Sequence, residues 1–361
     1  MRVFTALGAA IVTLLSTQKA LGAPIKYKLS SRFLDSNSST ADNTTSGSAP
    51  SGTSSPSNNS IPSIPHYIVY NDEASTPAPD PQDIQGFNVL NLAFILSDGK
   101  GADVAAEWEK LSDADRKSVL QKYNQAGIKI MVSAFGSTET PTTQGLSAET
   151  LANTMAEWVI KYGVHGIDVD YEDFAAINGK GVQWIVDFTN ALRLKLPQGQ
   201  YILTHAPVAP WFTKNGPYLK VHQQVGDLID WYNVQFYNQG NSTYNTCENL
   251  VTKMSNENPA LLEIIANGVP MEKLVIGKPA VTNDASNGFI SPTDLGNCLA
   301  QAKKDHGYNS GAMTWEYHTD GSSKTWIEGV LNGRSGSRRR GFQRRRRAPP
   351  DSDDSARVTK T

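Results

Sequence analysis

The sequence predicts an α/β fold, a (β/α)8 TIM barrel with a disordered N-terminal stalk and a disordered C-terminal tail. Three observations lead to this prediction. From residue 66 onward, strand-like and helix-like segments alternate, as in βαβ units that build a parallel sheet. Eight such units fit into residues 66–333, a span close to the ~250 residues that this barrel uses. The fourth strand-like segment, residues 166–173, carries acidic residues towards its C-terminal end, where such barrels build their active sites.

The predicted strands are short runs rich in apolar residues, and the predicted helices show helical spacing of such residues. The strands are residues 67–70, 89–95, 129–134, 166–173, 201–206, 231–237, 274–278 and 311–315. The helices are residues 111–125, 148–162, 181–196, 246–254, 261–266 and 292–304. Gly127 and Gly163 follow two of these helices as C-caps, and Pro197 stops a third.

The sequence predicts two N-terminal segments before the barrel. Residues 1–22 form a signal peptide, because a basic start and the apolar run 3–15 are followed by small residues at the cleavage site. Residues 23–65 are a linker rich in Ser, Thr, Asn and Pro, with too few large apolar residues to fold. Three glycosylation sequons lie in this linker, and Asn241 begins a fourth. We therefore expect a secreted glycoprotein without stable membrane insertion, since no other apolar run is long enough to cross a bilayer.

The composition of residues 334–361 predicts that they form a disordered, Arg-rich tail after the barrel. Eight arginines fall within residues 334–347, and the acidic patch 351–354 follows them. The tail has a net charge of +7 and residues 1–62 have +3, so the remaining body carries 18 basic and 30 acidic residues, net −12. An acidic body argues against nucleic acid as a partner.

The chain has two cysteines, Cys247 and Cys298. In a secreted chain, a single pair without a third partner favours a disulfide. Cysteines and histidines at metal-ligand spacing are too few to predict a metal site, and no cofactor fingerprint is present. We therefore expect neither a metal nor a cofactor.

The strongest chemical signal is the alternation of apolar and acidic residues in the fourth predicted strand. In a strand, Asp168, Asp170 and Glu172 project to one face, roughly 7 Å apart. Acidic residues in a strand are often only a solvated face, but here they follow a helix and end in a turn. Neighbouring like charges raise the pKa of at least one of these carboxyl groups, which then stays protonated and can act as a general acid.

Other predicted strand ends should meet these carboxylates at the same face of the barrel. The sixth strand ends in Gln235, Tyr237 and Asn238, which offer hydrogen bonds to a polar, uncharged ligand. The eighth strand ends in Trp315, a flat apolar surface suited to a sugar ring. Small residues from Ser133 to Gly136 end the third strand. Each signal alone is weak, because aromatic residues in strands are usually core residues.

Together these motifs resemble glycoside hydrolase family 18, the chitinase family, and most of all its fungal secreted members. The run Asp168-Val-Asp170-Tyr-Glu172 is similar to the end of the family signature D-x-x-D-x-D-x-E. His165 stands in place of the first Asp of that signature, and Phe135 departs from the usual S-x-G-G of the third strand. The resemblance extends from about residue 66 to residue 331.

The resemblance implies a substrate-assisted, retaining hydrolysis of bonds between N-acetylglucosamine units. Glu172 would be the proton donor, Asp170 would hold the acetamido N–H, and Asp168 would share a proton with Asp170. Tyr237 would orient the acetamido carbonyl group, and Trp315 would form the floor under the reacting sugar. The expected substrate-binding set adds Gln235, Asn238, Ser133 and Gly136. The expected partner is chitin or its oligomers, bound by a monomer.

Two alternatives remain at this point. An endo-β-N-acetylglucosaminidase acting on N-glycans would use the same catalytic residues, so loop shape must decide between the two enzymes. A non-catalytic chitin-binding lectin on the same barrel would typically lack the acid. The presence of Glu172, Asp170 and Tyr237 together argues against the lectin.

Overall fold

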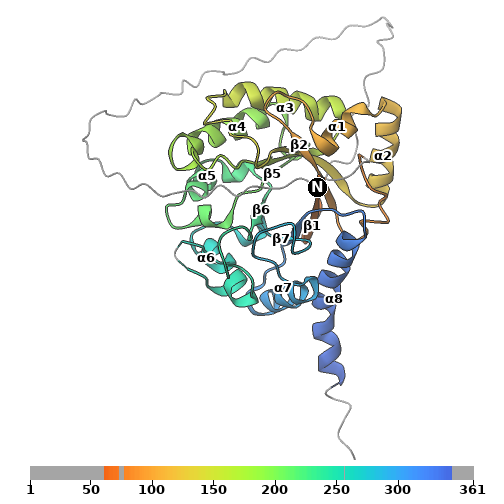
Figure 1. Ribbon diagram of the computed structural model, residues 1–361, viewed down its shortest axis with the longest axis vertical. Helices are drawn as coiled ribbons and strands as arrows, with labels where there is room; N and C mark the ends of the chain where they lie inside the picture. Colours follow the sequence, from red (N-terminus) through yellow and green to blue (C-terminus); the bar gives the residue numbers. More distant parts are fainter. Residues whose placement is uncertain (1–60, 73–76, 256, 344–361) are drawn as a thin grey trace, which may run out of the picture. The chain divides into compact units, whose positions relative to one another are not determined.

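A computed structural model of the chain describes residues 61–72, 77–255 and 257–343. The predicted signal peptide, the linker before residue 61 and the tail beyond residue 343 lie outside these residues. In the described part, eight parallel strands close into a barrel in sequence order, with β8 hydrogen-bonded to β1. Figure 1 shows helices α1 to α8 arranged around the strands. The predicted (β/α)8 barrel is confirmed.

The strands agree closely with the predicted segments. They are β1 (His66–Asn71), β2 (Val89–Ile95), β3 (Lys129–Phe135), β4 (Gly166–Asp170), β5 (Ile202–His205), β6 (Trp231–Gln235), β7 (Leu274–Pro279) and β8 (Gly311–Trp315). The helices are α1 (Asp103–Lys110), α2 (Asp113–Gln125), α3 (Ala148–Tyr162), α4 (Val182–Lys195), α5 (Pro217–Val225), α6 (Leu261–Ala266), α7 (Pro292–His306) and α8 (Ser322–Gln343).

Serine caps define the starts of three of these helices. Ser112, Ser147 and Ser291 each accept a hydrogen bond from the backbone N–H three residues ahead, at the starts of α2, α3 and α7. At the other end of α3, Gly163 adopts a left-handed conformation, φ 72°, which glycine reaches without a steric cost. The chain thereby leaves α3 and enters β4 within three residues.

Three helices, α1, α5 and α8, were not predicted, and one predicted helix is only a short turn. Helices α1 and α5 begin at Asp103 and Pro217 and are short, with 8 and 9 residues. In place of the helix predicted at residues 246–254, the chain forms a π-helical turn, Glu248–Thr252. Its start is covalently tied, because Cys247 forms the predicted disulfide with Cys298 of α7.

The tail predicted from Arg334 overlaps the end of α8, because this helix continues to Gln343. Gly333 is not a helix stop but a point of close contact with α7: a Cβ there would lie 2.5 Å from the carbonyl oxygen of Thr293. The next residue, Arg334, lies over the ring of Tyr67 and donates to Asn309. Packing against α7 and β1 therefore outweighs the polar composition of this segment.

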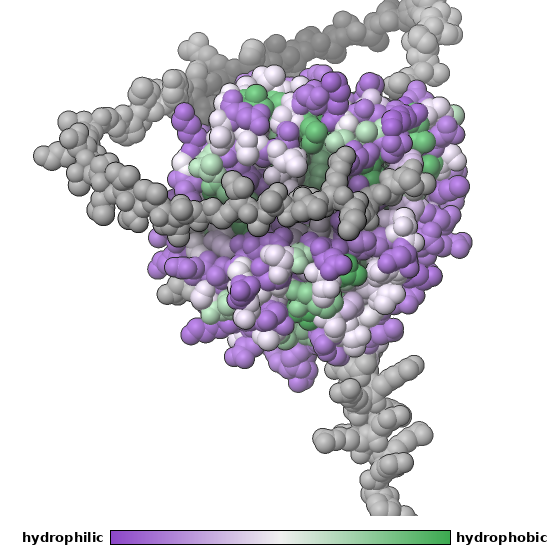
Figure 2. Space-filling view, in the orientation of Figure 1, coloured by the Kyte–Doolittle hydropathy of each residue, from purple (hydrophilic) through white to green (hydrophobic). Residues whose placement is uncertain are grey.

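The core has two layers. Side chains that point into the barrel form a small cluster, which includes Ile68, Val89, Met131, Ile202, Val275 and Met313. A much larger cluster fills the space between the strands and the surrounding helices. On the side of the molecule seen in Figure 2, hydrophilic residues predominate and the apolar areas are small. Among the described residues, no helix combines the length and apolar character needed to cross a membrane.

Candidate active site

Asp168 lies at the centre of a buried polar layer inside the barrel. The carboxyl group is 0% exposed and accepts four side-chain hydrogen bonds from four different strands. The donors are Tyr70 Oη at 2.7 Å, Ser133 Oγ at 2.8 Å, Thr204 Oγ1 at 2.6 Å and Asn233 Nδ2 at 3.0 Å. Burial raises the pKa of Asp168, while these four donors oppose that rise.

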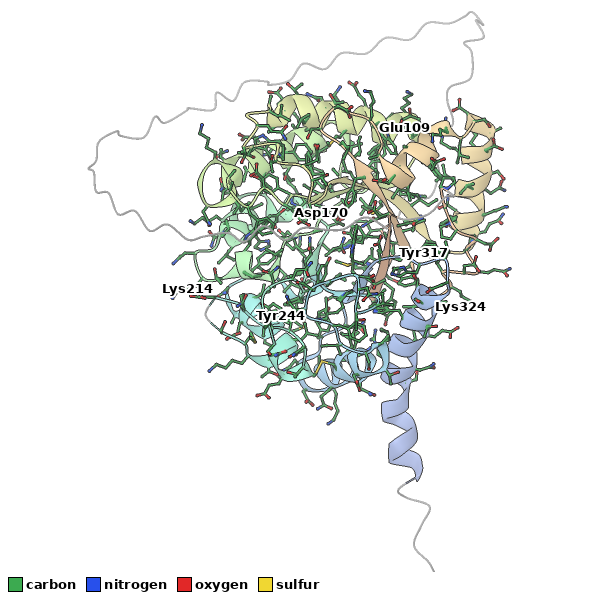
Figure 3. All side chains as sticks on the ribbon, viewed as in Figure 1. Glu109, Asp170, Lys214, Tyr244, Tyr317 and Lys324 are labelled. Carbon is green, nitrogen blue, oxygen red and sulfur yellow. A yellow bond between two sulfur atoms is a disulfide. The ribbon has the colours of Figure 1, made fainter. Side chains whose placement is uncertain are left out.

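Asp170 lies one pleat closer to the C-terminal face, at the last residue of β4. Its Oδ1 accepts a hydrogen bond of 2.9 Å from Nε2 of Gln235 on β6. Burial, followed by the negative charges of Glu172 and Asp168, raises the pKa of Asp170 well above its usual range. In Figure 3, Asp170 lies near the middle of the view, inside the ring of helices.

Glu172 lies beyond the end of β4 and is half-buried. The strand predicted over residues 166–173 therefore ends earlier than expected, at Asp170. Burial raises the pKa of Glu172, whereas hydrogen bonds with Gln235, at 3.3 Å, and with Asp170 lower it. Because Asp170 and Glu172 both have raised pKa values and share a hydrogen bond, this pair retains a proton more readily than separate carboxyl groups would.

These two carboxyl groups open into a cavity of about 490 Å³ at the C-terminal face of the barrel. This volume is within the usual range of small-molecule sites. Its lining combines acidic, amide and aromatic side chains. They include Asp170, Glu172, Gln235, Tyr237, Asn238, Phe94, Phe174 and Trp315. The barrel thus brings the predicted residues of β4, β6 and β8 to one place.

Tyr237 and Trp315 form the hydrogen-bonding and aromatic parts of this cavity. Burial and the nearby charges of Asp170 and Glu172 raise the pKa of Tyr237 well above its usual range, so the hydroxyl group stays neutral and can donate. Trp315 is half-buried and stacks against Phe94, with ring centroids 5.8 Å apart. The cavity therefore offers a proton donor, a neutral hydroxyl group and an aromatic surface together.

Of the remaining predicted binding residues, Gln235 and Asn238 line the cavity and Ser133 and Gly136 do not. Ser133 is fully buried because it donates to Asp168. Gly136 is buried beneath the ring of Phe94, and its backbone N–H donates to the carbonyl oxygen of Asp170 at 3.0 Å. Ser133 and Gly136 thus contact Asp168 and Asp170 in this structure, and their role as substrate contacts stays a prediction.

The two departures from the family pattern leave this arrangement intact. His165 lies at the start of β4, far along the strand from Glu172, where its Nε2 lies 3.0 Å from Oδ1 of Asn124. Burial lowers the pKa of His165 to about 4, so the ring is neutral. Phe135 directs its ring towards α4, where it contacts Trp184 and Phe188.

Sequence reasoning missed several residues of the site. Tyr70, Thr204 and Asn233 were treated as ordinary strand residues, although polar side chains at inward positions of apolar strands were a usable signal. Phe174 lines the cavity with 53% of its surface exposed and packs on Trp211. No local pattern distinguishes this aromatic residue from a core residue.

Asp173, the residue after Glu172, lies in a loop, but it is fully buried and accepts hydrogen bonds from Thr143. The sequence shows nothing of these contacts, because Thr143 lies 30 residues earlier in the chain.

The family model for glycosyl hydrolases family 18 matches residues 66–329. A chitinase of Enterococcus faecalis is 24% identical over 258 residues, which cover 65% of this chain and 72% of that protein. Endochitinase 3 of Metarhizium anisopliae is 29% identical over 155 residues, 43% of this chain and 47% of that protein. The similarity thus includes bacterial and fungal proteins.

Among solved structures, a family 18 chitinase of Pseudoalteromonas aurantia superposes with a TM-score of 0.62. It is 25% identical in sequence, and the match covers 74% of this chain and 99% of that one. The family match to residues 66–329 covers a similar share of this chain.

Proposed function

Because the chain belongs to glycosyl hydrolases family 18, we propose that it is a chitinase that hydrolyses β-1,4 bonds between N-acetylglucosamine units. The observation that carries this proposal is the joint presence of Glu172, Asp170 and Tyr237 at one cavity of suitable volume. The chitinase names of its relatives support the same substrate class.

In the proposed reaction, a sugar lies on Trp315 with its glycosidic oxygen towards Glu172. Glu172 donates its proton to that oxygen, and the bond from the oxygen to the anomeric carbon breaks with its electron pair going to the oxygen. The acetamido carbonyl oxygen of the same sugar bonds to the anomeric carbon and forms an oxazolinium ion. Water then opens this ion and gives its proton to Glu172, so the configuration is retained.

Asp170 and Tyr237 position the internal nucleophile. Asp170 accepts the acetamido N–H and stabilises the positive charge that develops on the group. The neutral hydroxyl of Tyr237 donates to the acetamido oxygen. Gln235 donates through one nitrogen to both carboxyl groups, at 2.9 Å to Asp170 and at 3.3 Å to Glu172, and so links the acid to the orienting carboxylate. Asp168 supports Asp170 from within the barrel and does not line the cavity.

The second candidate is an endo-β-N-acetylglucosaminidase, which would need the same carboxylates and tyrosine. The mixed aromatic and acidic lining of the cavity suits both chitin and N-glycans, because each substrate contains an acetamido sugar. The lectin alternative is disfavoured, since a binding protein needs neither a proton donor nor the pKa shifts that burial imposes on Asp170 and Glu172.

We also propose that the protein is a secreted, glycosylated monomer. The apolar run of residues 3–15 and the Cys247–Cys298 disulfide support export to an oxidising compartment. Expression of the full chain in a secreting eukaryotic host tests this: the protein in the medium should begin at Ala23 and lose mass on enzymatic deglycosylation. Retention of Met1 on protein found only inside the cells would contradict the proposal.

The catalytic proposal is tested by incubating the purified full chain with chitin oligosaccharides and, separately, with a high-mannose glycopeptide. The products are identified by their masses in a mass spectrometer. We expect shortened oligosaccharides and an intact glycopeptide. Cleavage of the glycopeptide alone would establish the second candidate. Binding of the oligosaccharides without cleavage of either substrate would favour the lectin.

A further inference from the structure

The backbone of Glu172 is not part of a β-strand, so the hydrogen bonds of the sheet do not fix its position. β4 ends at Asp170, so residues 171–173 lie outside the hydrogen-bonded barrel. The side chain of Glu172 forms hydrogen bonds with Gln235, at 3.3 Å, and with Asp170. A contact of this length constrains the carboxyl group weakly. Another part of the structure must therefore determine where this segment of backbone lies.

The residues on either side of Glu172 are both tied to the loop between β3 and α3. Asp173 Oδ2 accepts the backbone N–H of Thr143 at 2.6 Å, and its Oδ1 accepts the hydroxyl of Thr143 at 2.6 Å. On the other side, the hydroxyl of Tyr171 donates to Oγ1 of Thr142 at 2.8 Å. Two adjacent threonines thus hold the two neighbours of Glu172.

Asp173 has no direct access to substrate. The residue is 0% exposed and does not line the cavity. Its Oδ1 also accepts the backbone N–H of Ala176 at 3.3 Å, so its three donors are two backbone N–H groups and one hydroxyl, all neutral. Burying a carboxylate among neutral donors costs free energy, which suits a residue retained for geometry rather than for stability.

We propose that Asp173 is a positioning residue, which with Thr143 fixes the backbone of Glu172 so that the acid meets the glycosidic oxygen. The inference rests on the proposed function, because it needs Glu172 to be the proton donor. Asp173 donates no proton and touches no substrate. Its effect reaches the reaction only through the position of its neighbour, and a misplacement of about 1 Å is enough to cost ~100-fold in rate.

Kinetics on two substrates can distinguish a positioning role of Asp173 from a purely structural one. A sugar leaving group departs as a poorly stabilised alkoxide and needs the proton of Glu172, whereas p-nitrophenolate departs with little help from an acid. A misplaced acid should therefore slow the hydrolysis of chitin oligosaccharides much more than that of p-nitrophenyl chitobioside. A loss of folded protein should slow both reactions equally.

The experiment compares kcat/KM on the two substrates for wild type, Asp173→Ala, Thr143→Val and Thr143→Ser. We expect Asp173→Ala to lose about 100-fold on oligosaccharides and less than about 10-fold on the aryl substrate. Thr143→Val keeps its backbone N–H but loses the hydroxyl. Its kcat/KM should therefore also fall more on oligosaccharides than on the aryl substrate, but by a smaller factor than in Asp173→Ala. Thr143→Ser retains the hydroxyl and should behave like the wild type.

Asp230→Asn is the control for the loss of a buried carboxylate elsewhere in the barrel. Asp230 accepts a backbone N–H, from Leu203, and unlike Asp173 also pairs with Arg193; it precedes β6 at the opposite end of the barrel from Glu172. This variant should change the two activities by the same factor. Circular dichroism and thermal unfolding report the folded fraction of every variant.

An unchanged ratio of the two activities in folded Asp173→Ala and Thr143→Val would overturn the positioning role, while oligosaccharide cleavage by the wild type still supports the proposed function. Hydrolysis of neither substrate by the wild type would overturn both proposals. A bias as large in Asp230→Asn as in Asp173→Ala would also overturn the positioning role, because it would show a general response to the loss of a buried carboxylate.

Discussion

Nε2 of Gln235 donates to Oδ1 of Asp170 across the mouth of the barrel, over 2.9 Å. The same nitrogen lies 3.3 Å from Oε1 of Glu172 and 2.9 Å from the carbonyl oxygen of Ala206. One amide on β6 therefore links the two carboxyl groups of the cavity to each other and to the end of β5. The amide lowers the pKa of both carboxyl groups, against the rise that burial imposes.

Replacing Gln235 with Met keeps the length of the side chain and removes the donor. We expect the pKa of Glu172 to rise further, because its ionised form loses a hydrogen bond. The alkaline limb of the pH profile of kcat/KM should move to higher pH, since the acid stays protonated longer. Gln301→Met, an exposed change on α7, is the control. A limb that moves to lower pH would contradict this account of the acid.

Glu172→Gln keeps the shape of the side chain and removes the proton donor. We expect hydrolysis of chitin oligosaccharides to fall by about 1,000-fold or more, while their binding, measured by calorimetry, remains close to that of the wild type. Glu149→Gln, an exposed change at the start of α3, should leave both properties unchanged. Turnover of Glu172→Gln at the wild-type rate would show that another group donates the proton.

Asp170→Asn should stabilise the protein, and more so at alkaline pH. The folded pKa of Asp170 is raised above its unfolded value near 3.8, so the folded state binds this proton more tightly. Its contribution to stability is therefore fully present below the unfolded pKa and is lost as the pH rises through the folded pKa. Asparagine is neutral throughout and avoids the cost of a buried charge.

Thermal unfolding of wild type and Asp170→Asn at about pH 5 and about pH 9 measures this difference. We expect the gain in midpoint temperature to be at least ~2 °C larger at the higher pH. A gain that is larger at the lower pH would have the wrong sign for a raised pKa. The variant should also lose activity, because a neutral amide does not stabilise the positive charge that develops on the acetamido group.

Replacing Cys247 and Cys298 together with serine should destabilise the barrel. The disulfide joins residues 51 positions apart, from the loop after β6 to α7. Loss of such a cross-link lowers the free energy of unfolding by about 3–4 kcal/mol in the chain-entropy model. Denaturant unfolding of the double variant and of wild type, both without reductant, gives this value. Equal midpoints would mean that the cross-link adds nothing to stability.

Phe174→Ala should weaken the binding of long oligosaccharides. The ring lines the cavity beside Glu172 and is half exposed, so an apolar face is open to a sugar. Losing that contact costs about 1–1.5 kcal/mol, roughly a tenfold rise in KM for long substrates. Leu194→Ala removes another exposed apolar side chain, 84% exposed on α4, and serves as the control. Equal KM values for Phe174→Ala and wild type would exclude this contact.

The barrel and the row of carboxylates were predictable because both depend on patterns along a short stretch of chain. Alternation with period two identified β4 and placed Asp168 and Asp170 on one face. Helical period located α3 and α6 to the residue, and Gly163 marked the end of α3. The strand end was not predictable, because the turn after Asp170 depends on contacts with another loop.

Tertiary structure alone decided which side chains surround each functional group. Tyr70 lies 98 residues before Asp168, and only closure of the barrel brings its hydroxyl within 2.7 Å of that carboxylate. The same closure buries Ser133, for which the family resemblance had implied a substrate contact. Packing on α7 extends α8 through a segment whose composition predicts disorder. Periodicity is local and can be read along the chain, whereas hydrogen-bond partners and burial depend on segments that meet only in the folded barrel.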